Sequence, residues 1–141
     1  MKTFQAMAAA ALLAATAAGA GADAAEAAGP AQPTGVWRNP KNSVHVRIQP
    51  CGANVCGTVV WANARAQEKA RQGGTPRLVG TQLFREFRRE SATSWAGRVF
   101  VPDRGQTYSG TLRLAGANQI VARGCLLGRY LCRSQTWSRV S

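Results

Sequence analysis

Four cysteines are the residues of this chain whose type and spacing most directly predict chemistry. They form two close pairs, Cys51 with Cys56 in CGANVC and Cys125 with Cys132 in CLLGRYLC. Three connectivities are possible. We favour the two local pairs because each short segment contains a glycine and could cross a hairpin end or a bulge, and each bridge would add about 2 kcal/mol by loop-closure entropy. A zinc site is disfavoured because neither spacing is C-x-x-C and His45 is the single histidine. We therefore expect two disulfides and no metal.

Side chains suited to catalysis are sparse. The sequence has no G-x-S-x-G segment and no second histidine to act beside His45. Beyond residue 28 the acids are Glu68, Glu86, Glu90 and Asp103. They fall in a helical segment, in the arginine-rich LFREFRRE and in a turn, so we expect surface charge partners rather than two carboxylates facing one cavity. This pattern predicts no enzyme and no cofactor.

The first 28 residues have the composition of an export signal. A short basic start, MKTFQ, precedes the apolar run AMAAAALLAATAA, which is too short to cross a bilayer core of about 30 Å. We interpret residues 1–28 as a signal peptide with its cleavage region, 29–34 as a flexible linker and 35–141 as a single β domain. We expect a periplasmic or secreted protein with no transmembrane segment in the mature chain, which suits the use of disulfides.

The chain is strongly basic. It carries 18 Lys plus Arg against 6 Asp plus Glu, a net charge of +12, and loss of Lys2, Asp23 and Glu26 with the leader would leave +13. Such a charge attracts polyanions, although a solvated arginine-rich surface explains the same composition. No basic run is longer than Arg88-Arg89, and no basic stripe is interleaved with aromatic residues, so we expect no specific nucleic-acid binding.

Apolar and polar residues alternate along most of the remaining chain. In SVHVRIQ the valines and the isoleucine share one face, and in QTYSGTLRL the tyrosine and both leucines do. This period of two predicts half-buried antiparallel strands, and segments rich in Pro, Gly, Asn and Asp supply the turns between them. The predicted strands are residues 34–38, 43–49, 55–61, 81–87, 94–101, 106–114, 119–125 and 133–140.

The segment NARAQEKARQGG, residues 63–74, interrupts this alternation. Asn63 can cap a helix of about ten residues and Gly73 can end it. Because its apolar residues are alanines, we expect a short helix packed lightly over an opening, or a loop. Eight short strands with one such element predict an all-β domain, either a small antiparallel eight-stranded barrel or a closely related sandwich. An eight-stranded barrel is nearly filled by side chains or holds one small ligand.

Five aromatic residues lie on predicted strands: Trp37, Trp61, Trp95, Tyr108 and Trp137. Most should supply core area, because buried aromatic residues dominate the apolar burial of small domains. Tryptophan and tyrosine also carry a polar group that suits a wet cavity. Trp61, Trp95 and Tyr108 are therefore the candidate ligand-binding residues.

The G-x-W of residues 35–37, together with Arg139 in QTWSRV, resembles the lipocalin and calycin barrels. In those barrels a first-strand tryptophan packs at the closed end, and an arginine of the last strand lies across it. The resemblance implies a structural closure in which the Arg139 cation lies over the face of Trp37.

The chain is also similar to the bacterial family called domain of unknown function 2147, small exported proteins without an assigned activity. The segments that carry this similarity are GVW at 35–37, CGANVCGTVVW at 51–61, GGTPRLVGTQLFREF at 73–87, WAGRVFVPDRGQTYSGTL at 95–112 and GCLLGRYLCRSQTWSRV at 124–140. The resemblance implies a periplasmic, mainly β domain with a calycin-like barrel. It brings no catalytic residues with it.

These observations lead to two hypotheses about function. The first is a non-enzymatic binding module for a small apolar or amphipathic ligand. Arginines near the rim would allow this ligand to be anionic. The alternative is a cell-envelope interaction protein that binds anionic lipid, lipopolysaccharide or peptidoglycan through its basic surface.

Overall fold

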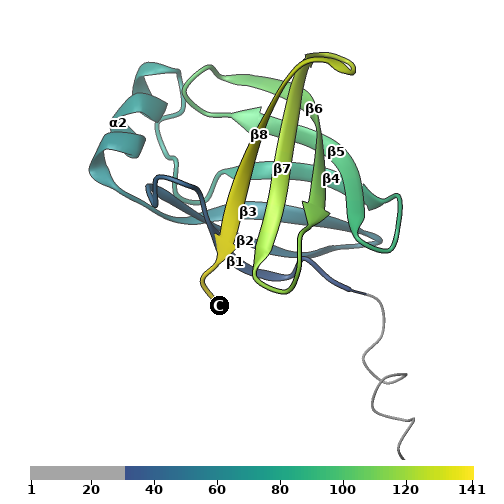
Figure 1. Ribbon diagram of the computed structural model, residues 1–141. Helices are drawn as coiled ribbons and strands as arrows, with labels where there is room; N and C mark the ends of the chain where they lie inside the picture. Colours follow the sequence, from purple (N-terminus) through teal and green to yellow (C-terminus); the bar gives the residue numbers. More distant parts are fainter. Residues whose placement is uncertain (1–30) are drawn as a thin grey trace, which may run out of the picture.

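All eight predicted strands form, and they close into an antiparallel barrel in which β8 pairs back onto β1 (Figure 1). The strands are β1 (Gly35–Arg38), β2 (Val44–Cys51), β3 (Asn54–Ala62), β4 (Gln82–Arg89), β5 (Ser94–Val101), β6 (Gln106–Leu114), β7 (Gln119–Leu127) and β8 (Tyr130–Arg139). The bounds of β5 and β6 coincide with the prediction, and the other ends differ by at most three residues. The predicted all-β barrel is confirmed, and the sandwich is excluded.

The computed structural model describes residues 31–141. The expected signal peptide, residues 1–28, lies outside this range. Residues 31–34 belong to the expected flexible linker, yet they contact the barrel. Pro33 is fully buried, and the Arg89 guanidinium donates a hydrogen bond to the carbonyl oxygen of Ala31 at 2.7 Å. Within the described range no helix has the length and apolarity needed to cross a membrane.

Alternation along the strands places one row of each strand in a common core. On β2, Val46 and Ile48 are buried while Arg47 between them is exposed. Successive side chains of a strand point to opposite faces, so the inward-facing row of each strand contributes side chains to the core. The large buried side chains of this core are Trp37, Ile48, Phe84, Phe87, Trp95, Leu112, Ile120 and Trp137.

A short helix, α2 (Ala64–Gln72), forms where the sequence predicts one. The side-chain oxygen of Asn63 accepts the backbone N–H of Ala66 at 2.8 Å, which satisfies one of the donors left free at a helix start. Gly73 is the C-cap. Ala70 is the buried residue of the helix, so α2 is attached to the barrel along one narrow side.

We expect Asn63→Ala to lower the free energy of unfolding by about 1 kcal/mol, because the Ala66 N–H loses its partner. Urea unfolding followed by circular dichroism measures the change. Lys69→Ala is the matched control, since it alters an exposed residue of the same helix and should cost less than about 0.5 kcal/mol. Equal costs in both variants would contradict a capping role for Asn63.

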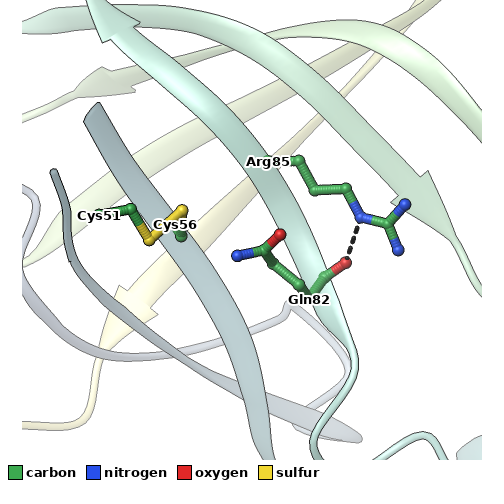
Figure 2. Close-up of a disulfide and its surroundings, with 4 residues drawn as sticks. All are labelled: Cys51, Cys56, Gln82 and Arg85. Carbon is green, nitrogen blue, oxygen red and sulfur yellow. Dashed lines mark hydrogen bonds between the residues drawn. A yellow bond between two sulfur atoms is a disulfide. The ribbon is translucent and has the colours of Figure 1, made fainter. Parts of the chain in front are cut away.

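The four cysteines lie in two pairs at disulfide distance, Cys51 with Cys56 and Cys125 with Cys132, as their spacing predicts. The first pair connects the ends of β2 and β3, and Figure 2 shows it beside Gln82 of β4. The second pair joins register partners on β7 and β8. Both bridges therefore hold hairpins together locally rather than tying distant parts of the barrel.

Candidate functional site

The structure does not bring the three candidate ligand residues together. Trp95 is buried in the core, with the guanidinium carbon of Arg89 4.6 Å from its ring centroid. Trp61 lies on the outer side of β3, 43% exposed, with its ring centroid 4.6 Å from that of His45. Tyr108 is half-buried on the inward row of β6. These side chains do not share one cavity, and a ligand role for any of them stays a prediction.

Aromatic side chains from opposite walls meet in the middle of the barrel. Phe84 on β4 and Trp137 on β8 are four strands apart around the barrel, yet their ring centroids are 5.6 Å apart. Phe84 also packs edge-on against Phe87 at 5.8 Å. Gly57 makes room for this cluster, because a Cβ at that position would lie 2.5 Å from a ring carbon of Phe84. At this level the lumen is filled by side chains.

Helix α2 and the segment after it lie at the end of the barrel that holds the β1–β2 and β5–β6 turns (Figure 1). The Asn63 backbone N–H donates to the carbonyl oxygen of Ser43 at 2.9 Å. The Thr75 hydroxyl donates to the carbonyl oxygen of Pro102 at 3.0 Å. These contacts tie the helical segment to both turns at this end of the barrel.

Trp37 and Arg139 lie at the opposite end of the barrel. They are register partners on β1 and β8, and the guanidinium carbon of Arg139 is 4.3 Å from the centroid of the Trp37 ring. Arg139 also donates to the carbonyl oxygens of Thr34 at 2.7 Å and Ala117 at 2.8 Å. Gly35 has a φ of 133°, and a Cβ there would collide with the Arg139 guanidinium. The Arg139 cation thus lies over the Trp37 ring as the implied closure requires. The contribution of this closure to stability stays a prediction.

A wide hollow lies on the outer face of β4, β5, β6 and β7, with a volume of about 1040 Å³. We call it the outer groove. Its floor contains the small residues Ala96, Ser109 and Thr111. Its walls carry four exposed arginines: Arg88, Arg98, Arg123 and Arg129. The groove exists because long basic side chains stand around a floor of short ones.

Strand register aligns part of this groove as a row across four strands. Arg88 pairs with Ala96, Ala96 with Thr111, and Thr111 with Arg123. The row thus begins and ends on an arginine and has small side chains between. Neighbouring strands are about 4.8 Å apart, so the two arginine backbones stand about 14 Å apart. Their side chains can lean over the floor from both sides toward one bound group.

The groove contains more positive charge than its carboxylates neutralise. In residues 31–141, one ion pair forms in the groove, between Arg98 and Glu86 at 3.0 Å. The other three groove arginines have no carboxylate at ion-pairing distance within that range. The second ion pair, Arg71 with Glu68 at 2.7 Å, lies on α2, where the hydrogen bond from Arg71 lowers the pKa of the Glu68 carboxyl. A planar guanidinium offers five donors that match phosphate and carboxylate geometry, so the groove is suited to an anion.

His45 and the four cysteines are already engaged, the cysteines with one another. His45 contacts Asn42 Oδ1 at 2.7 Å and the ring of Trp61. Among residues 31–141, no three His, Cys, Asp or Glu side chains are grouped as a metal ion would need. The chemistry that the groove residues offer is anion binding.

The groove arginines were missed in the sequence. They come from β4, β5, β7 and the β7–β8 turn, and only strand register brings Arg88 and Arg123 onto one row. A partial signal was present, because Arg98, Thr111 and Arg123 all occupy outward, polar positions of their strands. Finding the row also required knowing which residues pair across the strands.

The closed eight-stranded barrel with its tryptophan and arginine closure places the protein in the class of lipocalin-like barrels. The chain belongs to the family described as "Uncharacterized protein conserved in bacteria (DUF2147)", which matches residues 35–139. Its fold is similar to that of protein HP1028 from the human pathogen Helicobacter pylori, described as belonging to the lipocalin family. The TM-score is 0.63 at 13% identity, over 78% of this chain and 84% of that one. Both resemblances drawn from the sequence are thus confirmed, and the resemblance to lipocalins is confirmed at the level of the fold. No curated protein matches the sequence.

Proposed function

We propose that this protein is a non-enzymatic binding module of the periplasm that holds a small anionic, amphipathic molecule in the outer groove. The observation that carries the proposal is the row from Arg88 to Arg123, in which two arginines without ion pairs in the described range flank small side chains. The volume of about 1040 Å³ is just above the range of about 300–1,000 Å³ for small-ligand sites. The two cysteine pairs at disulfide distance support an exported protein.

The groove can contact both parts of an amphipathic ligand. The arginine side chains supply charge-assisted hydrogen bonds to a phosphate or carboxylate. Between them the floor includes Ala96, Ser109 and Thr111, whose short side chains leave room for an alkyl chain to lie along the sheet. The interior is the weaker location, since the contact between Phe84 and Trp137 crosses the lumen.

Dodecyl phosphate below its micellar concentration is a suitable probe, because it joins an anionic head to an alkyl chain. We expect Arg88→Gln/Arg123→Gln to weaken its binding by about tenfold, measured by isothermal titration calorimetry. Hydrogen bonds to charged groups contribute about 1.5–3 kcal/mol each, and screening at these exposed positions reduces that contribution. Inorganic phosphate should bind the native chain more weakly than dodecyl phosphate.

The matched control is Arg47→Gln/Arg65→Gln, which removes the same charge from two exposed positions outside the groove. It should change the affinity by less than about twofold at physiological salt. Equal losses in the two double variants would show that net charge, and not the groove, binds the probe. Absence of dodecyl phosphate binding by the native chain would refute the proposal.

A further inference from the structure

Half of the large apolar side chains that are exposed in residues 31–141 lie in one short segment, residues 126–131, where β7 turns into β8. We call this segment the hairpin tip. Its exposed side chains are Leu126 at 50%, Leu127 at 63%, Tyr130 at 75% and Leu131 at 66%. Every other large apolar side chain in the described range is less exposed than these four. The tip is therefore the main apolar surface that the folded barrel leaves in water.

The hairpin tip is exposed on both of its faces. Leu126 and Leu127 are consecutive residues of β7, so their side chains point to opposite sides of the hairpin. The cause lies in the closure of the barrel, because β1 is short and its register partners on β8 are Ser138 and Arg139. The distal part of the β7–β8 hairpin extends beyond this closure and projects from the barrel (Figure 1).

The hairpin tip is also held in a fixed shape. Leu127 and Tyr130 are register partners, and the turn between them has Gly128 at a φ of 54°, a left-handed conformation that glycine adopts at little cost. At the base, Cys125 and Cys132 form a disulfide between register partners. A partner therefore meets a pre-formed apolar hairpin, which reduces the ordering cost of binding.

Positive charge surrounds the hairpin tip. Arg129 lies in its turn, and Arg123 and Arg133 are exposed on the strands just below it. Residues 104–141 contain six arginines and no aspartate or glutamate. An apolar projection in a basic surround is complementary to a surface that is negatively charged outside and apolar beneath.

We propose that the hairpin tip inserts into the headgroup region of an anionic lipid bilayer. Each strand runs two residues beyond the disulfide, which at about 3.4 Å per residue gives a projection of about 7 Å before the turn of Gly128 and Arg129. Amphipathic elements at a membrane surface bury their apolar face to a depth of about 5–10 Å. Tyr130 has the amphipathic ring that is enriched at this depth, and Arg123, Arg129 and Arg133 are placed to contact lipid phosphates.

A bilayer suits the hairpin tip better than a protein does. Six residues on a projecting hairpin cannot supply the area of about 800 Å² per partner that a stable protein interface buries. A second copy of this chain would bring its own Arg123, Arg129 and Arg133 toward the same arginines of the first, which opposes pairing through the tip.

The hairpin tip and the outer groove are neighbours. A register row runs from Arg98 through Ser109 and Cys125 to Cys132, from the groove to the base of the tip, and Arg129 borders both. Insertion would therefore hold the groove close to lipid headgroups. The insertion itself does not depend on a groove ligand, because it rests on the exposure and charge of the tip.

The test is vesicle flotation with the chain from Ala31 onward, the part that forms the complete barrel. Vesicles of phosphatidylcholine mixed with phosphatidylglycerol are compared with phosphatidylcholine alone. We expect the native chain to bind the mixed vesicles, and Leu127→Ser/Tyr130→Ser to lower the partition coefficient by at least about tenfold. Arg129→Gln/Arg133→Gln should lower binding to the mixed vesicles by about fivefold per arginine, with little change on neutral ones.

The matched control is Val60→Ser/Val79→Ser, which removes two exposed apolar side chains outside the tip and should leave vesicle binding unchanged. Failure of the native chain to bind the mixed vesicles, or an equal loss in this control, overturns the proposal. The proposal is also overturned if the native chain does not bind vesicles and is instead a dimer in sedimentation equilibrium that Leu127→Ser/Tyr130→Ser converts to a monomer. The tip variant should keep its affinity for dodecyl phosphate, which separates failure of insertion from failure of the groove.

Discussion

Replacing Trp37 with alanine is expected to lower the free energy of unfolding by about 3–5 kcal/mol, as for other large buried aromatic residues. The side chain is fully buried, so the variant loses apolar burial and leaves a cavity at the closed end of the barrel. Its indole N–H donates to the carbonyl oxygen of Pro33 at 2.8 Å, and that buried acceptor would lose its partner. The Arg139 guanidinium would lose the ring on which it lies. Urea unfolding followed by circular dichroism measures the loss.

Two further variants separate closure from the general cost of removing a tryptophan. Trp61→Ala removes a side chain of the same size that is 43% exposed, and it should cost less than about 1.5 kcal/mol. Arg139→Gln keeps Trp37 but removes the cation and its hydrogen bonds to Thr34 and Ala117, at a cost of about 1–3 kcal/mol. Similar losses for Trp37→Ala and Trp61→Ala would contradict a closing role for Trp37.

The fold was predictable because its determinants are local. Alternation along each strand reflects the pleat, so the inward positions of Val46 and Ile48 follow from their spacing alone. The start of α2 follows from the preference of Asn63 for capping, and its end from Gly73. The short cysteine spacings favoured the two local pairs among three possible connectivities, and the local pairs form.

The outer groove and the hairpin tip were not predictable. The groove depends on strand register, and the exposure of the tip depends on the absence of a neighbouring strand in the described part of the chain. Arg88 and Arg123 share a row only through two intervening strands, and a register shift on β4 between Arg85 and Arg88 moves the pairing in a way that alternation does not encode. Leu127 and Tyr130 are typical of a buried strand. They are exposed because the short β1 meets β8 only near Arg139 and leaves the distal hairpin without a facing wall.

Because side chains fill the lumen, we expect Phe84→Ala to cause the second large loss of stability. Phe84 is 3% exposed and contacts both Phe87 and Trp137, so its truncation should cost about 3–5 kcal/mol and leave a cavity between opposite walls. An apolar cavity of this kind stays dry and binds small apolar molecules. Benzene should therefore raise the Tm of Phe84→Ala, measured by differential scanning calorimetry, and leave the native Tm unchanged.

Phe100→Ala is the control for this effect, because Phe100 is half-buried and lies beneath the Arg85 guanidinium at 4.5 Å instead of crossing the lumen. It should cost less than about 2 kcal/mol and create no benzene site. If benzene raised the native Tm as much as that of Phe84→Ala, the lumen would already hold an apolar cavity. The interior would then replace the outer groove as the first place to seek a ligand, with Trp95 in the core and Tyr108 on the inward row of β6 as the aromatic candidates.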